Sequence, residues 1–305
     1  MYEDDDDWVP VYLGGELLLL NYLHLVGITV LYWDHLQTFA QEVNLIWSRS
    51  KSLSAYCFFV NRYFAFISGI PVAVIPFLSP STEKCVRLSL FREIVIVLMQ
   101  VITCAVMIVR VYALYGRNQR VLWFMVGTAA CVAGVSIWSF TGQRGSRTLL
   151  EGGCHYGLTP ATSYRLAGCW EALFGFDVVI FALTIHYAYS ADRLGIRQTK
   201  LHALLVRHGA LYFGIMALSN LANISTFYMV EYWPYLPGAL STFADCISVT
   251  VISRLILHMH ELANEGILTE AANPRGLSSL DNSRTIEVGG NATTERFESY
   301  MDSSL

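Results

Sequence analysis

Long apolar runs, separated by short polar segments, constrain this chain more than any other feature. The clearest run is IVIVLMQVITCAVMIV, which covers residues 94–109 without a charge. An α-helix needs about 20 predominantly apolar residues to cross the hydrocarbon core of a bilayer. Only 14% of the residues are charged, whereas soluble domains average about a quarter. The pattern predicts an all-α membrane protein, a bundle of seven transmembrane helices.

Seven segments have the length and apolar character of membrane spans. They cover about residues 17–39, 53–78, 88–115, 121–140, 166–189, 204–229 and 238–258. We expect a seven-helix transmembrane domain over residues 17–261, an acidic extracellular N-terminus over 1–16, and a disordered cytoplasmic tail over 262–305. The first helix either continues as one long helix to Trp47 or turns into the interface there; we expect the long helix. Pro71 and Pro76 should kink or end the second helix.

The distribution of basic residues predicts the orientation in the membrane. With the N-terminus outside, ten Lys and Arg residues fall in inner loops or at inner helix margins, and six fall on the outer side. Cytoplasmic loops of membrane proteins carry the excess of basic residues. We therefore expect the N-terminus outside and the C-terminus in the cytosol, in the plasma membrane rather than in an internal membrane.

Two of the seven cysteines can form a disulfide on the outer side. Cys85 lies just before the third predicted helix, and Cys154 lies in the loop after the fourth, so both face the same side. Disulfides persist in oxidising compartments, which agrees with an outside location. Cys169 is an alternative partner for either cysteine, and two unpaired loop cysteines are the simpler alternative.

Ionisable residues near the turn between the first two helices predict a charge clamp. Reflecting the chain about Ser50 puts Arg62 level with Thr38, and Asp34 and Glu42 lie one helical turn to either side of that point. Ionisable groups at membrane depth need a partner, and a guanidinium suits carboxylates. We expect Asp34, Glu42 and Arg62 to form a structural clamp between the helices; a charge switch near the inner face is the alternative.

A second set of polar residues lies deeper in the predicted spans and is a candidate ligand or ion pocket. Aromatic residues at positions 170, 174, 227 and 228 lie near this set in the sequence. Polar groups that converge among aromatic side chains are typical of a small-ligand site. The alternative is that each group is satisfied by a hydrogen bond between helices. The five residues of the candidate pocket are Gln100, Asp177, Asn220, Asn223 and Asp245.

Metal, catalytic and nucleic-acid sites have no motif in the sequence. The eight histidines are scattered, and no HExxH, GxSxG or glycine-rich phosphate loop occurs. The net charge of −4 includes no basic block of the kind that binds nucleic acid. We expect no cofactor, no metal, no nucleic-acid partner and no enzymatic activity.

Several short motifs match those of a known family. They are Asp34-His35, Thr38, Glu42-Val43, Ile46-Trp47, Asn61-Arg62-Tyr63, the stretch 110–115, Asp177 with Leu183-Thr184, and Ser253-Arg254-Leu255. Through them the chain resembles the multi-pass membrane proteins of mushroom-forming fungi (basidiomycetes) that carry the domain of unknown function 6533, with the signature over residues 17–78. The resemblance implies a fungal integral membrane protein with seven helices, and it supplies no activity.

The plan of the chain is also similar to that of a G-protein-coupled receptor. The shared features are an outside N-terminus, seven spans, a cysteine before helix three, another in the following outer loop, and a tail rich in Ser and Thr. The motif Arg110-Val111-Tyr112 follows Val109 instead of an acid, and no NPxxY motif occurs in helix seven. Likeness of plan is an analogy and does not fix function.

These features leave three functional hypotheses. The first is a receptor-like sensor, with an unknown small ligand in an outer pocket and a cytosolic signalling protein at the inner loops and tail. The second is a small-solute transporter or channel, although the chain lacks the internal repeats common in transporters. The third is a structural or assembly role in the membrane. In each case the lipid bilayer is the first partner.

Overall fold

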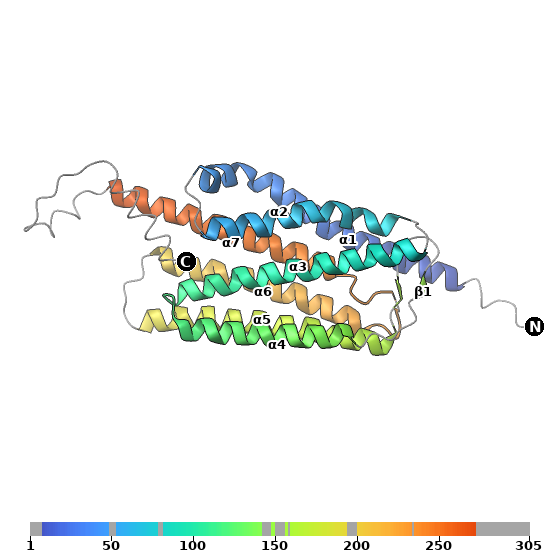
Figure 1. Ribbon diagram of the computed structural model, residues 1–305. Coiled ribbons are helices and arrows are strands. Elements are labelled where there is room, and N and C mark those ends of the chain that lie inside the picture. The colour runs from blue at the N-terminus through green and yellow to red at the C-terminus, as the bar shows by residue number, and fades with distance from the viewer. Residues whose placement is uncertain are drawn as a thin grey trace, which may run out of the picture.

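The structure, a computed structural model, describes residues 8–48, 53–78, 82–141, 148–149, 156–157, 159–193, 200–233 and 235–272. Residues 1–7 of the predicted N-terminus, Cys154 and residues 273–305 of the predicted tail lie outside this part. Across the described residues the chain forms seven α-helices (Figure 1). They are α1 (Trp8–Glu42), α2 (Leu53–Val74), α3 (Thr82–Leu114), α4 (Gln119–Thr141), α5 (Pro160–Arg193), α6 (Lys200–Tyr228) and α7 (Ser241–Ala272).

Four short elements extend or connect these helices in the described part of the chain. A π-helical turn (Val43–Trp47) continues α1, and a 3₁₀ turn (Ile75–Phe77) ends α2. Between α4 and α5, β1 (Thr148–Leu149) pairs antiparallel with β2 (Tyr156–Gly157). The strand pair lies at the end of the bundle that carries the N-terminus, which we call the N-terminal end; α7 finishes at the opposite end, the tail end (Figure 1).

Five helices are long and apolar enough to cross a membrane: α2, α3, α4, α5 and α7. The chain is therefore an integral, multi-pass membrane protein. Within the described residues α1 and α6 fall below this threshold, so the prediction of seven spans holds for the number of helices and stays a prediction for the number of crossings.

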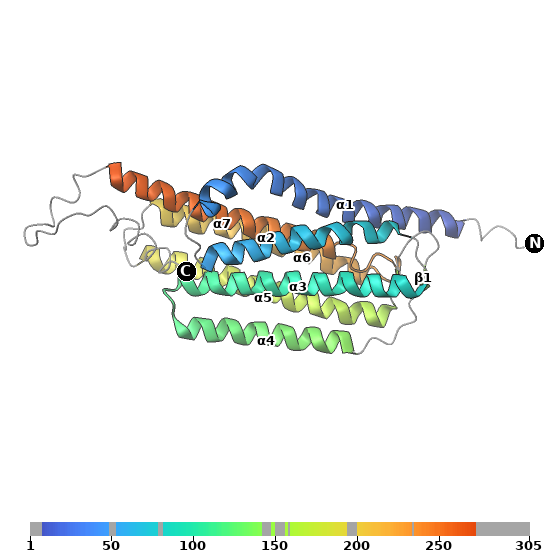
Figure 2. The ribbon, with the colours of Figure 1, turned by 45° about the horizontal axis from the view of Figure 1, so that its top comes forward.

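The helices differ sharply in how much they are covered. In the most apolar 18-residue stretch of α7, 72% is buried inside the protein, whereas in that of α4 only 6% is buried. Figure 2 shows α4 at the edge of the bundle and α7 among its neighbours. In a membrane protein, exposed apolar side chains face lipid. Helix α7 is thus the central element, and α4 presents most of its surface to the bilayer.

The first helix is continuous, as expected. No break separates the membrane-spanning part of α1 from its amphipathic continuation, and the π-turn carries the helix on to Trp47. Pro71 lies inside α2, which ends three residues later at Val74, and Pro76 lies in the 3₁₀ turn. Proline removes a backbone donor and clashes with the preceding turn. The second helix therefore ends where the sequence predicts.

Four predicted helix ends are wrong because hydrophobicity marks the membrane-buried part of a helix and not its full length. Helix α1 begins at Trp8, ahead of the predicted position 17, so part of the predicted N-terminal segment 1–16 is helical. Helix α3 begins at Thr82, ahead of the predicted position 88, and Arg87 donates to Glu83 across one turn at 2.6 Å. Helix α5 begins at Pro160 rather than near 166, and proline suits the first helical position. Helix α7 runs to Ala272, so the predicted disorder from Leu262 begins too early; ELANEGILTEAA is rich in good helix formers.

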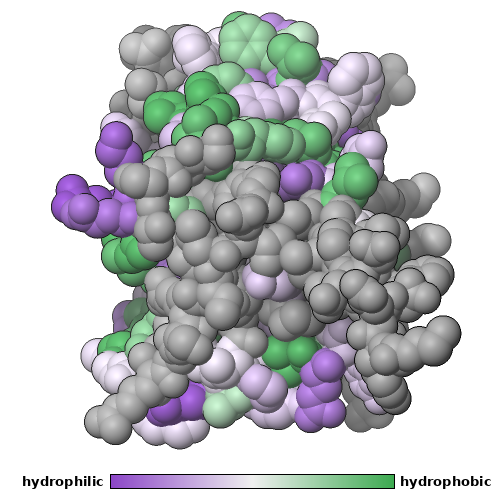
Figure 3. Space-filling view, turned by 90° about the vertical axis from the view of Figure 1, so that its right-hand side faces the viewer, coloured by the Kyte–Doolittle hydropathy of each residue, from purple (hydrophilic) through white to green (hydrophobic). Residues whose placement is uncertain are grey.

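The main hydrophobic core joins the helices toward the tail end. Five of its members, each at most 1% exposed, come from α2, α3, α5, α6 and α7: Phe58, Met107, Ile180, Met216 and Ile252. Helices α1 and α7 approach closely, because a Cβ on Gly27 would lie 2.8 Å from the Cα of Phe243. Seen from the N-terminal end (Figure 3), both hydrophobic and hydrophilic residues of the described part reach the surface.

Candidate functional site

Arg62 is buried between α1 and α2 and contacts both carboxylates that the sequence assigns to it. Its Nε lies 2.9 Å from Oε2 of Glu42, and its Nη1 lies 3.4 Å from Oδ2 of Asp34. The Nη2 atom donates to Oγ1 of Thr38 at 2.6 Å and to the carbonyl oxygen of His35 at 3.1 Å. The guanidinium uses its planar fork on four groups of one helix, as the antiparallel arithmetic predicts.

Asp34 accepts from a second guanidinium, which comes from α7. Nε of Arg254 donates to Oδ1 of Asp34, and Nη2 of Arg254 donates to Oε1 of Gln37 at 3.1 Å. Arg254 is partly exposed, whereas Asp34 is buried. One carboxylate therefore joins three helices, because α1 supplies Asp34, α2 supplies Arg62 and α7 supplies Arg254.

Glu42 is fully buried, accepts hydrogen bonds from two side chains and forms an ion pair with a third. Its Oε1 takes hydrogen bonds from the Tyr63 hydroxyl at 2.7 Å and from Nε1 of Trp47 at 2.9 Å, while Oε2 pairs with Arg62. Trp47 lies in the π-turn, and this turn places its indole beside the Glu42 carboxylate. Two acids and two arginines balance in this network of Asp34, Glu42, Arg62 and Arg254. A buried charge is tolerated when it is paired and hydrogen-bonded, as each is here.

The structure does not bring the five residues of the predicted pocket together on one cavity. Instead they pair across helix interfaces. Nε2 of Gln100 in α3 donates to Oδ1 of Asp245 in α7, and Nδ2 of Asn220 in α6 donates to Oδ2 of Asp177 in α5 at 2.6 Å. Asn223 accepts from Oγ of Ser241, a residue of α7, at 3.3 Å. These contacts are the interhelical hydrogen bonds of the alternative interpretation.

A cavity of about 630 Å³ lies between α3, α4 and α5, with the start of α7 and the α6–α7 turn at its N-terminal end. Of the five predicted pocket residues, only Gln100 lines it. Two of the predicted aromatic neighbours, Trp170 and Phe227, also line it, and positions 174 and 228 do not. Most of the lining is apolar, as in small-molecule sites. The physical reason for the displacement is that the predicted polar residues pair with one another across helix interfaces, whereas small side chains such as Ala105, Ala129 and Ala133 leave space between α3, α4 and α5.

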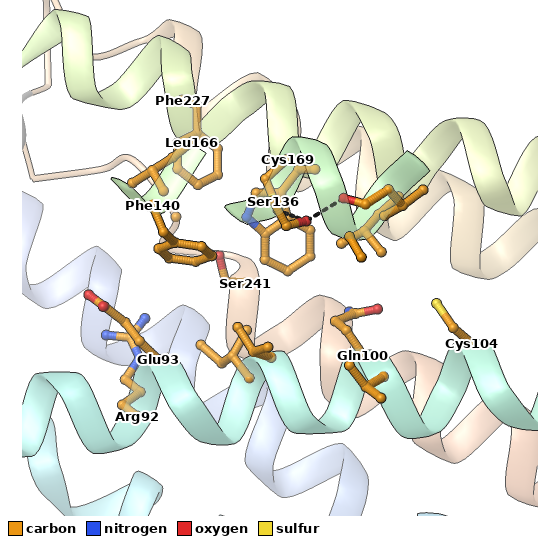
Figure 4. Close-up of a pocket in the computed structure, with 18 of the residues that line it drawn as sticks. Arg92, Glu93, Gln100, Cys104, Ser136, Phe140, Leu166, Cys169, Phe227 and Ser241 are labelled. Atoms are coloured by element: carbon orange, nitrogen blue, oxygen red, sulfur yellow. Dashed lines mark hydrogen bonds between the residues drawn. The ribbon is translucent and has the colours of Figure 1, made fainter. Parts of the chain in front are cut away.

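Few polar side chains face this cavity, and they lie at separate heights (Figure 4). Arg92 and Glu93 point into it from α3, about three turns after that helix begins. Gln100 lies about two turns further along, and Oγ of Ser136 lies 3.0 Å from the Cys169 sulfur on the opposite wall. The arrangement can hold a ligand by its apolar surface and orient it by a charged pair at one end. No acid–base–nucleophile triad is built from these residues.

Arg92 and Glu93 are absent from the predicted site. Arg92 is one of the six basic residues predicted on the outer side, because the third span is expected to start nearby and charges at a span's margin are common. The signal that could have found them is an adjacent pair of opposite charges immediately before the run 94–109, in the most apolar of the candidate spans, at a depth where a charge needs a partner.

Comparison with known proteins identifies one segment of the chain. Residues 22–67 match a family of unknown function, DUF6533. This match confirms the predicted resemblance over most of α1 and the larger part of α2. No curated protein and no solved structure matches the chain.

The DUF6533 segment contains the clamp and leaves out the cavity. Asp34, Glu42 and Arg62 all lie within residues 22–67, whereas their partner Arg254 and all the cavity-lining residues lie outside it. The segment also contains the face of α1 that meets α7, including Gly27. The segment that matches the family therefore supplies the parts of α1 and α2 against which α7 packs.

The cysteines and histidines supply no metal site in the part of the chain that the structure describes, where no group of three or more His, Cys, Asp or Glu side chains is placed to hold an ion. Cys85 is buried at the start of α3 and is not among the five free cysteines there. Cys169, the alternative partner, is free and contacts Ser136. Because Cys154 is not described, the Cys85–Cys154 disulfide stays a prediction.

Proposed function

We propose that this protein is a receptor-like membrane sensor that binds a small ligand in the cavity between α3, α4 and α5. The observation that carries the proposal is the cavity itself. Its volume of about 630 Å³ falls within the roughly 300–1,000 Å³ typical of small-molecule sites, and a mainly apolar lining with few polar groups is typical of them too. The proposal includes an outside N-terminus and a cytosolic C-terminus in the plasma membrane.

The charge network supports a role in coupling the helices to one another. Asp34, Glu42 and Arg62 act as a structural clamp in this proposal, and Arg254 attaches α7 to it. Helix α7 also receives the Gln100–Asp245 hydrogen bond from the cavity wall. A ligand that displaces Gln100 would therefore act on α7, whose far end extends past the bundle toward the tail.

Capture of cytosolic partners tests the sensor role. The full-length protein and a chain ending at Ala272 are compared by proximity labelling in cells, each with and without Ala133→Phe, which fills the cavity from α4. Ala130→Phe is the matched control, because Ala130 is exposed on the same helix and does not line the cavity. We expect a partner set that depends on the tail and changes with Ala133→Phe alone. An identical set for every variant would contradict a sensor.

A transporter or channel is the second candidate. Ionisable side chains inside membrane proteins often mark substrate or proton pathways, and the buried network at Asp34 is of this kind. Reconstituted vesicles that show flux or current, abolished by Asp34→Asn, would favour this candidate over the sensor. Vesicles without flux, together with cavity-dependent partner capture, would favour the sensor.

A further inference from the structure

The cavity between α3, α4 and α5 opens sideways toward the lipid. Val101 of α3 is 59% exposed and Ile137 of α4 is 64% exposed, yet both also line the cavity. Exposed apolar side chains on membrane-spanning helices face hydrocarbon, because water is absent from the bilayer core. Since this opening lies between two such helices, a molecule dissolved in the bilayer can reach the cavity without crossing water.

The cavity is elongated along the helix axes. Its lining on α3 runs from Ser89 to Ile108, which is about 28 Å at 1.5 Å per residue. On α4 and α5 the lining covers residues 129–140 and 166–176. Lipid chains run in the same direction as spanning helices. The shape therefore suits one extended hydrocarbon chain better than a compact ring system.

Polar groups gather at the end of the cavity where α3 begins. Ser89, Arg92 and Glu93 line this end, and the α3 wall beyond Gln100 continues with Val101, Cys104, Ala105 and Ile108. Within the described residues, Nε of Arg92 is buried and makes no hydrogen bond. A buried guanidinium nitrogen without a partner favours a ligand that brings an acceptor. This polar end directly precedes the uncharged stretch 94–109 of α3, so in a bilayer it would lie near the boundary between the hydrocarbon core and the headgroups.

Glu93 decides which headgroup fits. It lies beside Arg92 and points into the same cavity (Figure 4). A simple anion would gain from Arg92 and be repelled by Glu93, and a simple cation would experience the reverse. A headgroup that carries both charges can satisfy both side chains at once. A simple anion is disfavoured by repulsion from Glu93, and a simple cation is disfavoured by repulsion from Arg92.

We infer that this cavity binds a single-chain amphiphile with a zwitterionic headgroup, taken up sideways from the bilayer between α3 and α4. The anionic group of the headgroup contacts Arg92, its cationic group contacts Glu93, and its chain lies along Val97 and Val101. The molecule keeps the orientation that it has in the leaflet. This inference rests on the proposed ligand site and adds the class of ligand.

The test uses three probes of equal chain length: a lysophosphatidylcholine, a fatty acid carboxylate and an alkyltrimethylammonium. Each competes with a photoactivatable lysophosphatidylcholine for the full-length protein in nanodiscs. We expect the zwitterion to compete best. Arg92→Gln and Glu93→Gln should each weaken it by roughly tenfold or more, since hydrogen bonds to charged groups contribute about 1.5–3 kcal/mol. Arg87→Gln and Glu83→Gln are the controls, because this exposed pair on α3 lies outside the cavity lining and should change nothing.

The outcomes separate the ligand class from the site. Equal competition by all three probes, or no effect of the Arg92 and Glu93 variants, would overturn the inference that the ligand is zwitterionic. In that case, loss of labelling in Ala133→Phe would still support the cavity as the binding site. Labelling that persists in Ala133→Phe would overturn the site itself. Ile137→Trp narrows the opening toward lipid and should slow labelling by bilayer-loaded probe without lowering its final level; an unchanged rate would overturn sideways entry.

Discussion

Arg62 places one guanidinium against two buried carboxylates, so its loss should be costly. Arg62→Leu would leave Glu42 buried without its cation, and breaking a buried ion pair by removing one partner costs about 3–5 kcal/mol. We expect a drop of this size in the free energy of unfolding, measured in mixed detergent, together with poor surface expression. Arg87→Leu, an exposed arginine on α3, is the control and should behave as wild type. Normal stability of Arg62→Leu would refute the clamp.

Arg254 occupies the other side of Asp34, and its replacement should matter less. Its side chain is 44% exposed, and exposed ion pairs contribute about 1 kcal/mol or less. Arg254→Gln should therefore lower stability only slightly while increasing hydrogen exchange in the second half of α7. Unchanged exchange in α7 would show that the contact with Asp34 does not hold this helix.

A contact between two of these residues can be predicted from the sequence only when the chain between them fixes their relative heights along the helices. The short turn between α1 and α2 sets Arg62 level with Thr38, so the distances to Asp34 and Glu42 follow from counting residues. Arg254 is 220 positions from Asp34, and nothing local sets the height of α7 against α1. The cavity is harder still to predict, because Arg92, Ser136 and Trp170 line it together only through the packing of three separate helices.

Helices α1 and α7 are in close contact at a glycine of α1, and a substitution there tests the packing of the two helices. Gly27→Ala would put a Cβ 2.8 Å from the Cα of Phe243, a backbone atom that cannot turn aside. Overpacking of this kind costs about 1–3 kcal/mol. Gly134→Ala in α4 is the matched control, because its Cβ would meet nothing within 4 Å, and alanine is the better helix former by about 0.5–1 kcal/mol. The two variants should shift the unfolding midpoint in opposite directions; a stabilising Gly27→Ala would contradict the close approach.

Element ends show where hydrophobicity stops being informative. The apolar runs locate all seven helices, yet α3 and α5 start outside the predicted spans and α7 continues past Leu262. Outside the bilayer a helix is stabilised by propensity, capping and side-chain pairs such as Glu83 with Arg87, which carry no hydropathy signal.

For the whole molecule, the number of crossings decides whether the two termini lie on the same side of the membrane or on opposite sides. Five helices pass as candidate spans, and crossing by α1 and α6 as well makes seven. An odd number places the two termini on opposite sides. We expect an epitope tag at the N-terminus to be labelled on intact cells and a tag at the C-terminus only after permeabilisation. Labelling of both tags on one side would show an even number of crossings and would refute the seven-span topology.

The small molecules that remain bound to the purified full-length protein provide the most direct test of a ligand cavity between α3, α4 and α5. Mass spectrometry of extracts from wild type, Ala133→Phe and the control Ala130→Phe measures them at equal protein concentration. We expect a zwitterionic single-chain amphiphile on wild type and on Ala130→Phe, and its loss from Ala133→Phe. The same bound molecules in equal amounts on all three proteins would contradict the cavity as a ligand site.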